Sequence, residues 1–144
     1  MKKIVFESLK SKLIAMGFLY HTPRSLLSYQ DKRDIIQFGL IHFTFSENMS
    51  NILKDGVLPG KEALYRKEKN LCWFYINYPE DYEKNLSIVK SKGKRSAVDC
   101  CIVIKDFSEE QLNNMRIRKE SYNAVVHIGA LKTSNMKGIM LENK

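Results

Sequence analysis

The chain has 144 residues, of which 44% are hydrophobic and 28% are charged. This length and composition exclude an intrinsically disordered protein and predict a single globular domain over residues 1–144. The net charge of +8 favours a polyanionic partner such as nucleic acid, although a lysine-rich, solvated surface accounts for it as well.

The first 38 residues are expected to form an N-terminal helical segment, and residues 39–144 the core of the domain. Residues 3–16 place apolar side chains on one side of an amphipathic helix, and Gly17 ends it. A second, shorter helix is predicted to start at Thr22 and Pro23 and to run through Ile35.

A strand followed by a short helix is predicted next. The apolar run 40–45 forms the strand, and its alternation puts His42 and Thr44 on the same face. Ser46 is a favourable N-cap for the helix, and Gly56 stands where that helix would end. An ordinary strand-helix connection, with His42 and Thr44 satisfied inside the protein, is the alternative to a binding site here.

The remaining elements alternate between strands and short connections. Residues 57–69 form a loop, and Ser108 opens a capping box with Gln111 at the start of a short helix. Strands are expected at 71–77, 97–104, 123–127 and 138–142. This order predicts an α+β fold with a small mixed or antiparallel sheet.

The cysteines and the N-terminus bear on location. Cys72, Cys100 and Cys101 are odd in number and lack a CxxC spacing, which predicts buried, reduced thiols and no metal site. Charged residues interrupt the N-terminus too early for a signal peptide, and no apolar run is long enough to cross a membrane. We therefore expect a cytoplasmic protein without a membrane partner.

Three runs of sequence resemble the DarT-like DNA ADP-ribosyltransferases. Residues 42–56 resemble that family's H-x-T-x-x-x-N-L-x-x-I-L-x-x-G segment, with Met49 in place of the Leu. Residues 71–79 resemble its V-P-F-Y-F-N-P strand, and residues 123–127 resemble its late A-E-x-L-V-H strand. The resemblance implies an ADP-ribosyltransferase fold, in which two small sheets form a cleft that holds NAD as the substrate.

The same resemblance implies a cofactor-binding set and a catalytic set. The first comprises His42, Thr44, Asn48, Tyr75 and Asn77. The histidine and threonine would hydrogen-bond the ribose, the helix that contains Asn48 would bind the pyrophosphate at its N-terminus, and the Tyr75 ring would stack on nicotinamide. A core histidine and a core aromatic strand are the alternative interpretations.

The catalytic set departs from the family pattern. Breaking the bond to nicotinamide develops an oxocarbenium-like charge that a carboxylate stabilises, but the position of the family's catalytic Glu is Asn123 here. Glu120, three residues earlier, is a possible replacement. Arg66 falls where the family carries an active-site Arg, and a solvated surface Arg is the alternative.

Two basic groups are candidates for contact with nucleic-acid phosphates, or are simply solvated. They comprise Lys92, Lys94, Arg95, Arg116 and Arg118. These expectations describe an NAD-dependent ADP-ribosyltransferase, a glycosyltransferase-class enzyme that acts on a macromolecule such as DNA. Two alternatives remain: a catalytically impaired binder of NAD, ADP-ribose or nucleic acid on the same fold, and a small basic protein that inhibits a partner by surface contact.

Overall fold

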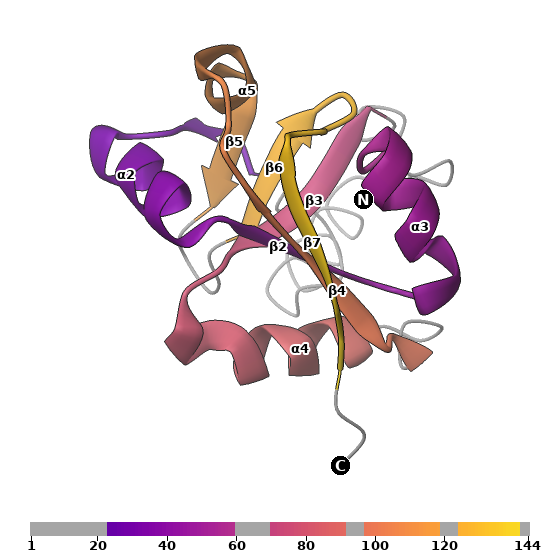
Figure 1. Cartoon of the computed structure of the whole chain (residues 1–144). Coiled ribbons are helices and arrows are strands. Elements are labelled where there is room, and N and C mark those ends of the chain that lie inside the picture. The colour runs from indigo at the N-terminus through magenta and orange to yellow at the C-terminus, as the bar shows by residue number, and fades with distance from the viewer. Residues whose placement is uncertain (1–22, 60–69, 92–96, 119–123, 142–144) are drawn as a thin grey trace, which may run out of the picture.

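One antiparallel sheet organises the part of the chain that the structure describes. The computed structural model describes residues 23–59, 70–91, 97–118 and 124–141 (Figure 1). Within them, seven strands follow the order β1-β5-β6-β3-β2-β4-β7, and every pairing is antiparallel. The predicted α+β class is therefore confirmed, with an antiparallel sheet.

The elements lie as follows. The strands are β1 (Ser25–Leu26), β2 (Leu40–Thr44), β3 (Leu71–Ile76), β4 (Cys100–Lys105), β5 (Met115–Arg118), β6 (Ala124–Ile128) and β7 (Asn135–Met140). The helices are α2 (Tyr29–Phe38), α3 (Ser46–Asp55), α4 (Tyr82–Lys90) and α5 (Glu109–Asn113), with a short 3-10 turn, η2 (Pro79–Asp81), before α4.

Side-chain hydrogen bonds fix where two of the helices begin. The capping box predicted at Ser108 is present, with the Ser108 hydroxyl accepting the amide of Gln111 and the Gln111 side chain accepting the amide of Ser108. An equivalent box between Ser28 and Asp31 starts α2. The second predicted helix therefore starts later than expected, at Tyr29, because Ser28 rather than Thr22 caps it.

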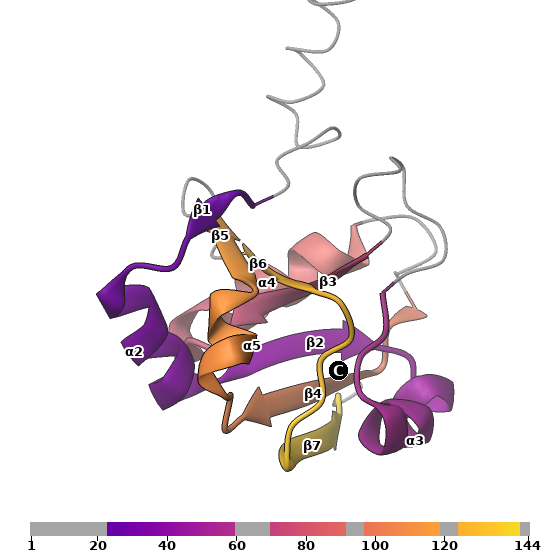
Figure 2. The ribbon, with the colours of Figure 1, turned by 90° about the horizontal axis from the view of Figure 1, so that it is seen from above.

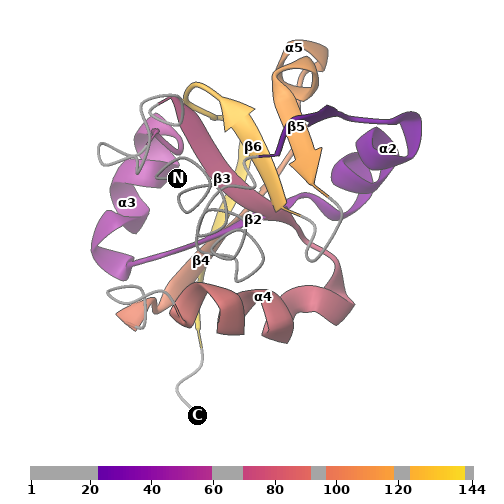
Figure 3. The same ribbon diagram turned by 180° about the vertical axis from the view of Figure 1, so that it is seen from behind.

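Helices cover the sheet unequally. Leu40, Ile102 and Phe74 point to one face, where α2, α3 and α5 contribute to the larger core. Ile41, Phe43 and Tyr75 point to the other face, where α4 packs. Figure 3 shows α4 on the near side of the sheet, and in Figure 2 α4 lies behind β3 and β6, apart from α2, α3 and α5.

The contact between β2 and β3 is short. Only two residue pairs join these strands, Leu40 with Ile76 and Ile41 with Tyr75, and we call these two pairs the seam. Beyond the seam β2 stays paired with β4, and β3 stays paired with β6. The two strands diverge toward α3 (Figure 1), which leaves two half-sheets, β1-β5-β6-β3 and β2-β4-β7.

Several predicted boundaries were wrong. The strand expected at 138–142 is β7, which begins at Asn135, and the strand expected at 97–104 begins at Cys100. β1, β5 and α4 were not predicted. The N-terminal helix at 3–16 and most of the 57–69 loop lie outside the described residues.

Candidate functional site

His42 lies immediately beyond the seam and bridges the diverging strands. Its Nδ1 is 3.0 Å from the carbonyl oxygen of Trp73 on β3, and its ring centroid is 5.6 Å from that of Phe74. Because a carbonyl can only accept, Nδ1 carries the hydrogen, and Nε2 of the neutral ring is then an acceptor. The side chain thus supplies a link between β2 and β3 where the backbone pairing has stopped.

Thr44 shares the His42 face of β2. The register pairs His42 with Ile102 and Thr44 with Cys100, so both polar side chains lie on the side of the larger core. Thr44 is buried, whereas His42 is half-buried. The carbonyl oxygen of Thr44 accepts the amide of Asp99 at 3.3 Å, which ties the end of β2 to the start of β4.

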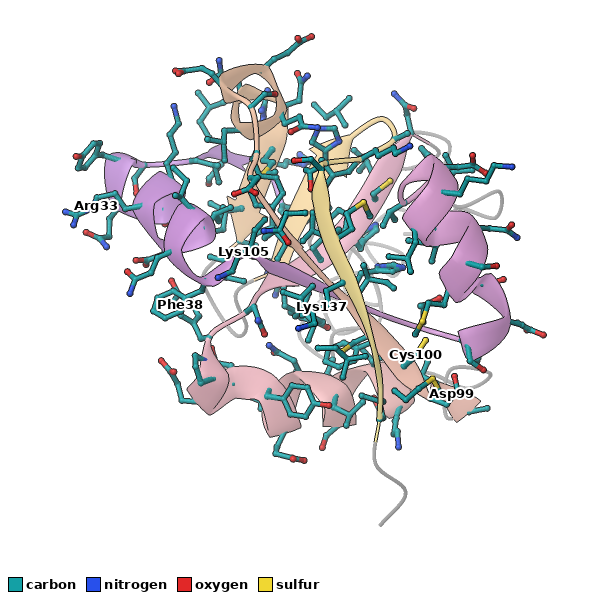
Figure 4. The ribbon with its side chains drawn as sticks, viewed as in Figure 1. Arg33, Phe38, Asp99, Cys100, Lys105 and Lys137 are labelled. Atoms are coloured by element: carbon teal, nitrogen blue, oxygen red, sulfur yellow. The ribbon has the colours of Figure 1, made fainter. Side chains whose placement is uncertain are left out.

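The N-terminus of α3 is capped by a carboxylate. Ser46 is the first residue of this helix rather than its N-cap, and its amide and hydroxyl both donate to Asp99, at 2.7 and 2.8 Å. These hydrogen bonds lower the pKa of the Asp99 carboxyl. Figure 4 shows Asp99 beside the start of α3.

This cap contradicts the phosphate site that we expected at α3. The negative charge of Asp99 occupies the end of the helix where the resemblance implied a pyrophosphate, and like charges repel. The amide of Asn48 is also engaged, donating to the carbonyl of Phe45 at 2.9 Å. The capping role of Asp99 was not predicted because Asp99 lies 53 residues from Ser46 in sequence, and no local sequence pattern indicates such a contact.

Tyr75 points to the opposite face from His42. It is 9% exposed and packs at 6.4 Å from the ring of Phe43, in the core beneath α4. The expectation that His42, Thr44 and Tyr75 line one crevice is therefore wrong, because adjacent strand residues alternate between faces and Tyr75 is out of phase with His42. Asn77 lies beyond the other end of the seam, where its amide donates to the carbonyl of Gly39 at 3.0 Å.

The face that carries Tyr75 also carries two of the predicted basic residues. Arg116 and Arg118 on β5 pair with Val126 and Ala124 of β6. On the other side of β6, Val126 and Ala124 pair with Trp73 and Tyr75 of β3. Paired residues of an antiparallel sheet share a face, so both arginines lie on the face of Trp73 and Tyr75.

Within this set, Trp73 is 39% exposed and both arginines are half-buried. The guanidinium of Arg116 donates to the carbonyls of Asn113 and Met115, at 2.9 and 2.8 Å. An exposed indole and two cations thus share one face of the half-sheet β1-β5-β6-β3.

Six predicted site residues lie outside the described part of the chain. They are Arg66, Lys92, Lys94, Arg95, Glu120 and Asn123. Their roles stay predictions. Among the described residues, no cluster of three or more His, Cys, Asp or Glu side chains is arranged to hold a metal ion.

His127 closes the third resembling run and is a core residue. It is 4% exposed, Nδ1 donates to the carbonyl of Gly129 at 2.9 Å, and Nε2 is buried without a hydrogen-bond partner. Desolvation lowers its pKa, the Gly129 contact opposing this in part. His127 is therefore neutral near pH 7 and structural.

The buried thiols have raised pKa values. Burial raises the pKa of Cys72 to about 12 and that of Cys101 to about 11. Both thiols stay protonated near neutral pH and are poor nucleophiles.

No protein-family model matches the chain, and comparison with curated proteins and with solved structures gives no significant match. Within the described ranges, every helix is too short or too polar to traverse a bilayer.

Proposed function

We propose that this protein is an NAD-dependent, ADP-ribosyltransferase-like protein that binds the dinucleotide where β2 and β3 diverge and acts on a macromolecule. The net charge of +8 favours nucleic acid as that macromolecule. The observation that carries the proposal is that the three resembling runs, far apart in sequence, contribute the neighbouring strands β2, β3 and β6.

His42 suits a role in holding a ribose. Its Nδ1–H contact with Trp73 fixes the orientation and tautomer of the ring, so that Nε2 is an acceptor suited to a hydroxyl group. A fixed side chain between two strands that have separated is the kind of pre-organised polar group that ligand sites use.

The α3 N-terminus does not fit the pyrophosphate as it stands. Asp99 would have to leave Ser46, or the pyrophosphate would have to contact basic side chains instead. The position of Asp99 therefore favours a lower affinity for NAD than the resemblance alone implies.

A binder without transferase activity is the second candidate. Asn123 offers a dipole where the family has a carboxylate, and this neutral side chain would stabilise the developing charge poorly. Such a protein would bind NAD or ADP-ribose and release no nicotinamide.

Calorimetric titration with NAD and with ADP-ribose, combined with an assay of nicotinamide release in the presence of DNA, RNA and protein extract, tests both candidates. We expect saturable binding that His42→Ala weakens by about tenfold, the loss of one good hydrogen bond. Lys84→Ala, an exposed substitution on α4, is the matched control and should bind as the wild type does.

The combinations of outcomes are distinct. Binding together with release supports the transferase, and binding without release supports the binder. No binding of either nucleotide, or equal binding by His42→Ala and the wild type, would contradict the proposed site.

A further inference from the structure

β7 forms a long edge of the sheet. The two edge strands differ, because β1 has two residues and β7 has six. Among the described residues no strand pairs with the outer side of β7, and Figure 2 shows it as the last strand beyond β4. A six-residue edge presents unpaired backbone groups that can template another strand.

The register shows which backbone groups face outward. The amide of Leu141 donates to the carbonyl of Asp99, at the start of β4. Since successive residues of a strand direct their backbone groups to opposite sides, Met136, Gly138 and Met140 direct theirs away from β4. The edge thus offers three residues for hydrogen bonding to an added strand.

The side chains of this edge are apolar and basic. Ile139 is 42% exposed and Met140 is 56% exposed, and Lys137, in the middle of β7, is exposed as well. Lys137 pairs with Val103, and Lys105 pairs with Asn135, so the two lysines and Ile139 share one face (Figure 4).

α3 holds the strand from the opposite face. Met49 of α3 packs over Gly138 so closely that a Cβ at position 138 would lie 2.5 Å from its sulfur. The helix therefore fixes β7 against the body of the protein and leaves its outer edge open. An ordered edge loses less conformational entropy when a second strand binds.

We propose that the outer edge of β7 binds an extended, acidic segment of another protein by adding a strand to the sheet. A residue of that segment opposite Lys137 would be Asp or Glu, and the residue two positions along, opposite Ile139, would be apolar. Charge decides between occupants: the chain carries +8, so an acidic segment is attracted, whereas a second copy would bring two such charges and two copies of Lys137 together.

A designed peptide tests this edge directly. The probe is the capped peptide Thr-Thr-Glu-Thr-Ile-Thr-Glu-Thr, which puts Glu, Ile and Glu on one face when extended, and the matched peptide has Lys in place of both Glu. Added at millimolar concentration to the ¹⁵N-labelled full chain, the acidic peptide should shift the amide signals of residues 135–140. It should also protect the amides of Met136, Gly138 and Met140 from hydrogen exchange, and the basic peptide should do neither.

Two variants, each with a control, separate side-chain recognition from backbone recognition. Lys137→Glu should weaken the acidic peptide about tenfold and create binding of the basic one. Lys84→Glu, with the same change in net charge on α4, should leave both unchanged. Met140→Pro, which removes one outward amide without touching the β4 ladder, should weaken the acidic peptide more than Met140→Ala does.

Three results would overturn the proposal. They are the absence of shifts at residues 135–140, equal effects of Lys137→Glu and Lys84→Glu, and a concentration-dependent dimer of the peptide-free chain that Met140→Pro abolishes. The last result would assign the edge to a second copy of this chain.

Discussion

The two sides of β2 are paired very differently. Toward β4, all five residues of β2 have a partner in the ladder, whereas toward β3 only Leu40 and Ile41 do. On the unpaired stretch a side chain, His42, contacts the backbone of the neighbouring strand instead. The β4 side is therefore the structural framework of β2, whereas the β3 side is joined by two residue pairs and one side-chain contact.

Alanine substitutions of the two residues in one register pair measure this difference. Ile102 of β4 and His42 of β2 are register partners on the same face; Ile102 is fully buried in the core, whereas the His42 side chain reaches toward β3. Ile102→Ala should lower the free energy of unfolding by about 2–5 kcal/mol, because it leaves a cavity in the core. His42→Ala should cost about 1 kcal/mol, the contribution of one hydrogen bond.

Urea denaturation of both variants gives the comparison. Similar losses of stability in the two variants would mean that the His42 contact with β3 stabilises the fold as much as the core next to the β2–β4 ladder does.

Introducing a carboxylate at position 123 should change activity, if the proposed function holds. If NAD binds where β2 and β3 diverge, Asn123→Glu should raise the rate of nicotinamide release by about two or three decades, the effect of an anion on an oxocarbenium-like transition state. Asn123→Gln is the control, because it adds length without charge. Equal release by the two variants would remove position 123 from the chemistry.

Buried His127, on the strand next to β3, should make the stability of the protein depend on pH. The pKa of buried His127 lies below its usual value of 6.5, so the unfolded chain binds a proton first as the pH falls. The stability that His127 contributes is complete above pH 6.5 and is lost as the pH drops from there toward the folded-state pKa.

Thermal unfolding at several pH values, for the wild type and His127→Gln, checks this prediction. The variant should be less stable at pH 8 and should lose less stability between pH 7 and pH 5. Parallel curves for the two proteins would show that His127 is not the titrating group.

Asp99→Asn should have the smallest effect, lowering the stability of the fold and raising the affinity for NAD. The amide side chain introduced at position 99 would still accept a hydrogen bond from Ser46, but it lacks the negative charge that stabilises the N-terminus of α3. The free energy of unfolding should therefore fall slightly, and the loss should be larger above the pKa of the Asp99 carboxyl than below it. Removal of that charge should also strengthen NAD binding at low salt. A weakening of NAD binding, measured by titration, would indicate that Asp99 holds the site together rather than repelling the ligand.

The sequence predicted local structure better than faces and partners. The strand at 71–77 and the capping box at Ser108 depend on neighbouring residues, and both are present. α4 was missed although Tyr82, Leu86 and Val89 form a helical stripe, because a buried Asn85 interrupts it and the preceding Pro79 indicated only a turn. β5 was missed because it is four residues long and half of them are Arg.

The candidate site depended on information that no single segment contains. Whether Tyr75 faces His42 follows from the register between β2 and β3, and a shift of one residue would reverse it. The Asp99 cap joins segments 53 residues apart. Both errors therefore arose in tertiary pairing, whereas the alternation of His42 and Thr44 within β2 could be predicted from its sequence.

The most direct test observes the imidazole of His42 itself. In long-range ¹H–¹⁵N spectra of the histidine rings, we predict the Nδ1–H tautomer for His42 in the free protein, because Nδ1 donates to Trp73. Addition of NAD should shift its Nε2 signal and leave that of His127 unchanged. An Nε2 signal of His42 that does not move at saturating NAD would contradict a dinucleotide site where β2 and β3 separate.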